Sequence, residues 1–285
     1  MSRIVTPVLA SLIVLGATAR GEEPIPGKDV TFTGTVPMTA FLQTSAGSNG
    51  MVHFEAWEVR DGKTVLAYDI DMTKIMHMIV VSEDLTDFQH VHPALLPTGH
   101  LVIDVHLKEA PASYHVYLDG RPKDNGRHVF RFDLPGDSQS VAPNRVLHAA
   151  GSAVNVGPYN VEIDPTAVPI GEISTVSVRI LKDGKPATDL HFYLGVMAHG
   201  VFIGINDLAY MHAHGMSAAM LNMASSANDC GDSMMTQMTP LPANQAIPNE
   251  FEFQILAPSA QAYDLWLQFI GGTTLYTAPM LVTTR

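Results

Sequence analysis

The stretch MHMIVVSEDLTDFQHVHP, residues 76–93, has a diverged second copy, AHGVFIGINDLAYMHAHG, residues 198–215. The two copies align without a gap at a separation of 122 residues, and the Asp-Gly-Lys of residues 61–63 falls on that of residues 183–185. Both copies carry three histidines in the pattern H-x12-H-x-H. A period of this size indicates tandem domains rather than a solenoid of short units.

A later block of sequence repeats at a larger separation. Residues 101–103 resemble residues 251–253, and residues 114–118 resemble residues 263–267 at a separation of 149. The second copy therefore holds about 27 extra residues after its last histidine.

Short runs rich in β-branched and aromatic residues, separated by Gly, Pro, Asp and Asn, predict strands throughout. The dipeptides Asp61-Gly62 and Asp183-Gly184 predict tight hairpin turns. We expect an all-β chain of two tandem immunoglobulin-like (cupredoxin-like) β-sandwich domains. The predicted domains are residues 20–150 and residues 151–285, with a methionine-rich insert at about residues 216–242.

The first 19 residues predict a signal peptide. Arg3 precedes an apolar stretch, and Ala17-Thr18-Ala19 matches the small-x-small pattern before a cleavage point, so the mature chain would begin at Arg20. We therefore expect a periplasmic or secreted protein with no transmembrane segment after signal removal. The net charge of -12 without a basic block argues against nucleic acid as a partner. The single cysteine, Cys230, excludes an internal disulfide.

The repeated histidines predict a metal site in each copy. If the strands on either side of residues 82–87 form a hairpin, His77 lies opposite His92, and His199 lies opposite His214 in the same way. Residues two apart in a strand share a face, so His90 and His212 join them. Three imidazoles on one rigid face suit copper or zinc. The alternative is that these histidines only line strand edges.

The methionines of the chain favour copper over zinc as the bound metal. The candidate thioether ligands lie next to the histidines or in the insert: Met76, Met78, Met197, Met211, Met216, Met220 and Met223. Soft sulfur favours Cu(I) over zinc. The alternative interpretation is that the methionines fill gaps in the cores.

The motifs of common hydrolases and nucleotide-binding enzymes are absent from the sequence. It has no H-E-x-x-H, G-x-S-x-G or P-loop pattern, and Cys230 has no nearby histidine for a blue-copper centre. We see no general base or nucleophile, so no enzymatic activity is predicted.

Residues 76–93, together with residues 194–199 and 210–214, resemble the exported immunoglobulin-like domains of the YtkA-like family. The resemblance covers most of the second repeat and the central and later part of the first. It implies a β-sandwich and a copper or heavy-metal context. Gly215 departs from the pattern, since a proline follows the first copy's HxH, and the insert is a second departure.

The expected function is that of an exported copper-binding protein for copper resistance, buffering or delivery, with one three-histidine site per repeat and zinc bound less tightly. Its expected partners are the metal ion and a copper-handling protein. Two alternatives stay open: a structural or adhesive two-domain module without metal, and a copper oxidoreductase that uses both sites.

Overall fold

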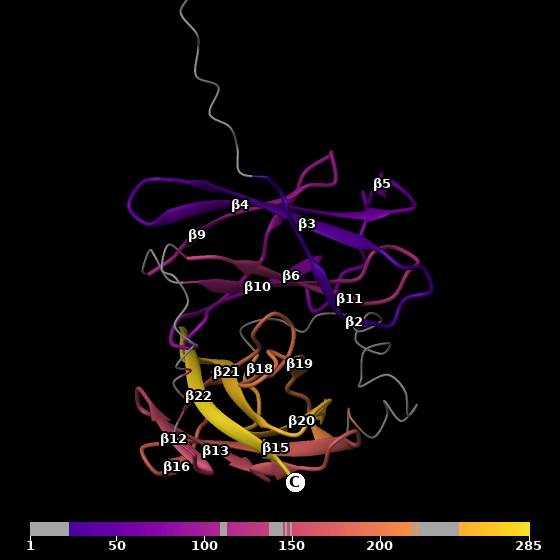
Figure 1. Ribbon diagram of the computed structural model, residues 1–285. Coiled ribbons are helices and arrows are strands. Elements are labelled where there is room, and N and C mark those ends of the chain that lie inside the picture. The colour runs from indigo at the N-terminus through magenta and orange to yellow at the C-terminus, as the bar shows by residue number, and fades with distance from the viewer. Residues whose placement is uncertain are drawn as a thin grey trace, which may run out of the picture.

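The computed structural model describes residues 23–108, 113–136, 145, 147–148, 150–218, 221 and 245–285. The fold is all-β, as the sequence predicts, and consists of two β-sandwich domains, one above the other in Figure 1. The first half of the chain forms the upper sandwich and the second half forms the lower one.

Each sandwich has an outer sheet and an inner sheet that faces the other domain (Figure 1). The outer sheet of the first repeat contains β1 (Ile25–Pro26), β3 (Thr39–Ala46), β4 (Met51–Arg60), β9 (Leu101–His106) and β8 (Ala94–Leu95), with β5 (Lys63–Thr64) paired to β4. Its inner sheet has the order β2 (Lys28–Phe32), β11 (His128–Leu134), β10 (Tyr114–Gly120), β6 (Met76–Ser82) and β7 (Phe88–Val91).

The second repeat follows the same plan. Its outer sheet contains β12 (Ala153–Val156), β13 (Tyr159–Asp164), β15 (Ile173–Lys182) and β16 (Lys185–Pro186), with β20 (Glu250–Leu256) paired to β15. Its inner sheet has the order β14 (Ala167–Val168), β22 (Thr274–Thr284), β21 (Ala262–Gly271), β18 (His199–Gly204) and β19 (Tyr210–His214), with β17 (Leu190–His191) paired to β21.

Strand pairing confirms the duplication at both separations. On the inner sheets, Val80 pairs with Val116, and the corresponding Phe202 pairs with Leu265. The outer sheets agree in the same way, because β4 pairs with β9 as β15 pairs with β20. The second repeat therefore keeps its ladder on both sides of its insert.

The two Asp-Gly turns are those that the sequence predicts. Asp61 and Gly62 have φ values of 51° and 74°, and Asp183 and Gly184 have φ values of 51° and 73°. Two consecutive positive φ values match the twist of a hairpin, and glycine adopts the second at little cost. These turns join β4 to β5 and β15 to β16.

The inner-sheet strand β6 is buried along its whole length because both of its faces are covered. Met76, Met78 and Val80 point into the core of the first sandwich. Ile79 and Val81 point the other way, into an apolar cluster shared by the two repeats. This double burial explains why residues 78–81 form a continuous apolar run rather than an alternating one.

The interface between the repeats is pseudo-symmetric. Phe88 stacks on Trp266 with ring centroids 4.8 Å apart, and Tyr210 stacks on Tyr117 at 4.7 Å. The duplication relates Phe88 to Tyr210 and Tyr117 to Trp266, so the same contact is made twice. This is the pattern of a two-fold symmetric dimer, here within one chain.

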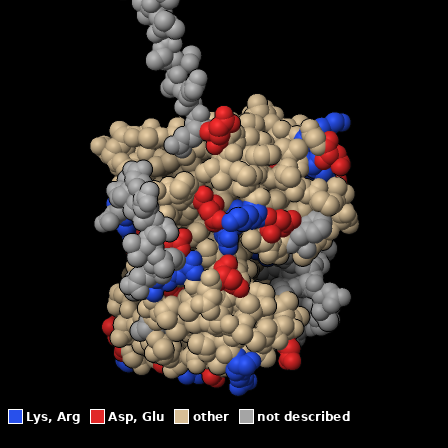
Figure 2. Space-filling model, in the orientation of Figure 1, with Lys and Arg blue, Asp and Glu red and all other residues tan. Residues whose placement is uncertain are grey.

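Polar contacts also join the repeats. Tyr117 donates a hydrogen bond to the Leu208 carbonyl at 2.9 Å, and Arg131 donates to the Asp207 carbonyl. Charged side chains of both signs lie along the junction on the face shown in Figure 2. The two sandwiches therefore form one packed unit rather than two loosely linked domains.

Several expectations concern residues outside the described part of the chain. These include the signal peptide, Arg20, Cys230 and most of the methionine-rich insert. Within the described residues, no helix combines the length and the apolar character needed to cross a membrane.

Candidate metal centre

The hairpins that carry the histidines have the predicted register. In the first repeat Ile79 pairs with His90, and the same register extended by two residues places His77 opposite His92. In the second repeat His199 pairs directly with His214. The three histidines of each copy therefore share one sheet face, and that face is the one turned toward the other repeat.

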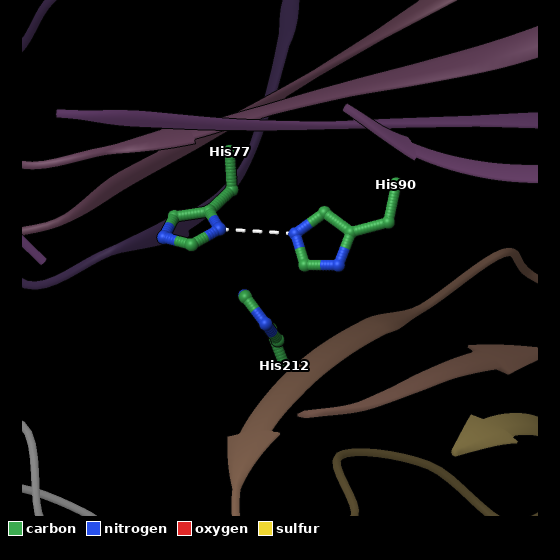
Figure 3. Close-up of side chains that lie close together, drawn as sticks. All are labelled: His77, His90 and His212. Carbon is green, nitrogen blue, oxygen red and sulfur yellow. Dashed lines mark hydrogen bonds between the residues drawn. The ribbon is translucent and has the colours of Figure 1, made fainter. Parts of the chain in front are cut away.

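All six repeated histidines consequently meet in a single cluster between the two inner sheets. Figure 3 shows His77 and His90 on the strands of one repeat and His212 reaching up from the other. The ring centroids of His77 and His212 are 5.0 Å apart, and those of His90 and His212 are 5.3 Å apart. This differs from the expectation of one separate site per repeat, because the two histidine faces pack against each other.

Two groups of three histidines in this cluster could hold a metal ion. His77, His90 and His212 form one group, and His199, His212 and His214 form the other. In each group one ligand nitrogen per residue lies within 4.8 Å of the others. The first group crosses between the repeats, and the second is the set expected for the second copy. His92 belongs to neither group; its ring contacts those of His77 and His90 at 5.0 and 4.8 Å.

In the first half of the cluster, two imidazole nitrogens present lone pairs to each other. The His90 Nδ1–H donates to Gln268 Oε1 at 2.9 Å, which leaves Nε2 without a proton. The His77 Nε2–H points to the Asp71 carbonyl at 3.3 Å, which leaves Nδ1 without one. These two nitrogens, His77 Nδ1 and His90 Nε2, are only 3.0 Å apart (Figure 3). A proton or a metal ion between them would remove the repulsion.

The second half has a matching close pair of nitrogens, but here a hydrogen bond can join them: His199 Nε2 has no hydrogen-bond partner among the described residues, so His199 Nδ1 can carry the proton and donate it to His212 Nε2. The His212 Nδ1–H donates to Asp119 Oδ2 at 3.2 Å, so its Nε2 carries a lone pair. That Nε2 lies 3.0 Å from His199 Nδ1. Two nitrogens bound tetrahedrally to one ion, each about 2.0–2.1 Å from it, would be about 3.3 Å apart. The observed spacing is therefore close to that of a metal site.

Burial keeps these imidazoles neutral. It lowers the pKa of His77 and lowers the pKa values of His90, His199 and His212 well below the usual range. The neighbouring imidazoles lower the pKa of His90 and His199 further. Burial also lowers the pKa of His92 to about 3. Neutral imidazole is the form that binds metal, so the cluster is in its binding state at neutral pH.

Two residues that the sequence analysis did not identify orient the histidines. Burial alone would raise the pKa of Asp119, but the Arg127 guanidinium, which donates to both of its oxygens at 2.7 and 2.5 Å, holds that pKa well below the usual range. Gln268 is fixed by its own bond to Thr277 Oγ1.

Asp119 and Gln268 occupy equivalent positions in the two repeats, and each holds a histidine of the other repeat. Their position just beyond the matched residues 114–118 and 263–267 was a signal that could have identified them. Hydrogen-bonded partners of this kind orient metal-binding histidines and set their tautomers.

The candidate methionines lie apart from the cluster or outside the described residues. Met76 and Met78 lie in the core of the first sandwich, on the face of β6 opposite His77, and Met197 lies in the second core. Met211 packs against that second core, on the opposite face of β19 from His212. Met216 packs with Met72, Val196 and Leu221 in a small cluster contributed by both repeats. Met220 and Met223 fall outside the described residues.

A groove between the repeats reaches the cluster. Its volume is about 500 Å³, and its lining includes Arg127, Tyr210, Met211 and His212. The groove passes His212, the one histidine that belongs to both metal-binding groups, but the His212 side chain is itself fully buried.

The family described as "Domain of unknown function (DUF8832)" matches residues 26–136 and again residues 153–285. The chain belongs to the DUF8832 family. The two matched segments correspond to the two sandwiches, so the family's domain is the repeated unit itself. No curated protein matches the chain.

Two of the solved structures that match the chain resemble it distantly. Alpha-2-macroglobulin of Escherichia coli, activated by porcine elastase, is 8% identical with a TM-score of 0.22; the match covers 87% of this chain but 23% of that one, so this chain spans less than a quarter of that protein. The FN1-FN3 domains of chicken CNTN1 are also 8% identical, with a TM-score of 0.20 and coverage of 92% and 99%. Similarity at this level carries no information about function.

Proposed function

We propose that this chain is an exported copper-binding protein that serves copper resistance, buffering or delivery, and that the histidine cluster between its repeats is the copper site. The observation that carries the proposal is the 3.0 Å approach of His77 Nδ1 and His90 Nε2, which face each other with lone pairs when the Asp71 carbonyl and Gln268 set the two tautomers. Of the six imidazoles in this cluster, those of His90 and His92 are half-buried and the other four are buried. Such a set of donors is costly to bury unless a cation occupies it.

Copper is the metal that the donors favour. Imidazole binds Cu(II) more tightly than Zn(II) in the general affinity order, and a four-coordinate cluster of neutral nitrogens also accepts Cu(I). Met216 packs with Met72 in the small apolar cluster formed by both repeats, and we propose that its thioether assists Cu(I) exchange. Zinc is the competing metal. The proposal that the protein is exported rests on the signal peptide predicted for residues 1–19.

The direct test is the metal content of the untagged protein purified from its native compartment, followed by competition titrations against a Cu(I) chelator and a zinc chelator. We expect copper in the native protein and tighter binding of copper than of zinc. His212→Gln should weaken copper binding strongly. His53→Gln is the matched control, because His53 lies on the outer strand β4 beside Asp104.

Two results would contradict the proposal. If zinc outcompetes copper, the cluster is a zinc site. If His212→Gln and His53→Gln both bind metal as the unmodified protein does, the cluster is not a metal site. The shared apolar interface, with its two stacked aromatic pairs, would then favour the second candidate function, a structural two-domain module.

A further inference from the structure

The six histidines differ in the contacts that their rings make. Four of them are all in mutual contact, with six centroid separations between 5.0 and 5.9 Å: His77, His90, His199 and His212. The ring of His92 contacts those of His77 and His90, and the ring of His214 contacts those of His199 and His212. Four rings that are all neighbours of one another stand at the corners of a tetrahedron, with two corners from each repeat.

The size of this tetrahedron fits one metal ion. With a ligand nitrogen about 2.0–2.1 Å from the ion and about 1.1 Å from its own ring centre, tetrahedral geometry places the ring centroids about 5.2 Å apart. Five of the six observed separations lie between 5.0 and 5.4 Å. The sixth, between His77 and His199, is 5.9 Å and must close by several tenths of an ångström.

His212 prevents the two three-histidine groups from holding two ions at once. It belongs to both groups, and its Nδ1 is engaged by Asp119, so only its Nε2 can bind metal. An imidazole nitrogen has one lone pair and binds one ion. The two groups therefore cannot be filled at the same time, and joining them into one site requires His199, which shares a 4.8 Å group with His212 but not with His77 or His90, to move toward those two residues.

We infer that the chain binds one metal ion, shared between its two repeats and ligated by His77, His90, His199 and His212, with His92 and His214 outside the coordination sphere. This inference rests on the proposed function and adds the ligand set and the stoichiometry. Each repeat supplies two ligands. One of the two, His90 or His212, is oriented by Gln268 or Asp119 of the opposite repeat. Neither repeat can build the site alone, and the bound ion ties the two sandwiches together.

The first experiment uses the unmodified, untagged chain. Native mass spectrometry after loading with Zn(II), and separately with Cu(I), counts the ions per chain, and X-ray absorption of the loaded protein counts the imidazole ligands. We expect one ion per chain and four imidazole nitrogens. Two ions per chain, or three imidazoles per ion, would overturn the shared site while leaving a metal-binding function intact. Failure to bind either metal would overturn the proposed function as well.

The second experiment compares His212→Gln with His214→Gln, two residues on one face of β19. Loss of a residue that only orients a ligand lowers metal affinity roughly 10–100-fold. Loss of His212 should lower the affinity for the single ion by more than that. Loss of His214 should lower the affinity by less than about tenfold, which is below that range. His77→Gln should remove the same ion as His212→Gln. If His77→Gln and His212→Gln remove different ions, or if His214→Gln is as damaging as His212→Gln, the ligand set is wrong.

Discussion

Acid should destabilise the metal-free protein steeply, because the central histidines are held neutral in the folded state. Burial lowers the pKa values of His77, His90, His199 and His212 below the value of about 6.5 that they have when unfolded. Below pH 6.5 the unfolded chain therefore takes up protons that the folded chain does not. Their contribution to stability is fully present above pH 6.5 and is lost as the pH falls toward the folded pKa values.

The expected loss is large compared with the stability of an ordinary protein. One pH unit below the unfolded pKa, each histidine that stays neutral in the folded state costs about 1.4 kcal/mol. Four of them give at most about 5–6 kcal/mol at pH 5.5, against a typical total of about 5–15 kcal/mol. His92, which is partly buried like His90 and whose pKa burial lowers to about 3, would add to this sum. The metal-free protein should be near its limit of stability by about pH 5.

Urea unfolding of the metal-free protein, followed by circular dichroism at pH 7.5, 6.5 and 5.5, measures this loss. The double variant His90→Gln, His212→Gln removes two of the four groups and should roughly halve the dependence on pH. The control is the double variant His53→Gln, His100→Gln, whose two histidines lie beside carboxylates of the outer sheet. A free energy of unfolding that stays constant between pH 7.5 and 5.5, or a control variant that flattens the dependence equally, would refute the reasoning.

Three further predictions concern the surroundings of the cluster. Asp119→Asn should weaken metal binding about 10–100-fold, and it should cost about 3–5 kcal/mol of stability because Arg127 loses its carboxylate partner. Dialysis against a metal buffer measures the affinity and urea unfolding measures the stability. An unchanged affinity would contradict the orienting role of Asp119. Trp266→Ala should cost about 3–5 kcal/mol and enlarge the particle in small-angle X-ray scattering, because it removes one stacked pair of the interface; an unchanged melting temperature would contradict this. Met216→Leu should weaken Cu(I) but not Cu(II) in chelator competition, whereas Met78→Leu in the core should change neither, and equal effects would exclude Met216 as a donor.

The sequence alone was sufficient to predict the repeat, the all-β class and the strand register around the histidines. These features are local: side chains alternate along a strand, and the length of the connection between two antiparallel strands sets which residues face each other. His199 lies opposite His214 for this reason. The same alternation places Met76 and Met78 on the face of β6 away from His77, so their role as core residues was also contained in the local pattern.

Only the tertiary structure decided that two histidine triads become one cluster. The faces that carry the triads also carry Ile79, Val81 and Val201, and burying that apolar surface brings the two inner sheets together. Burial of apolar surface is non-directional, and the residues it joins here are more than a hundred positions apart in the chain, so no local motif records which faces will meet. The contact of Asp119 with His212 arises from this docking of one sheet against another, and not from the sequence around either residue.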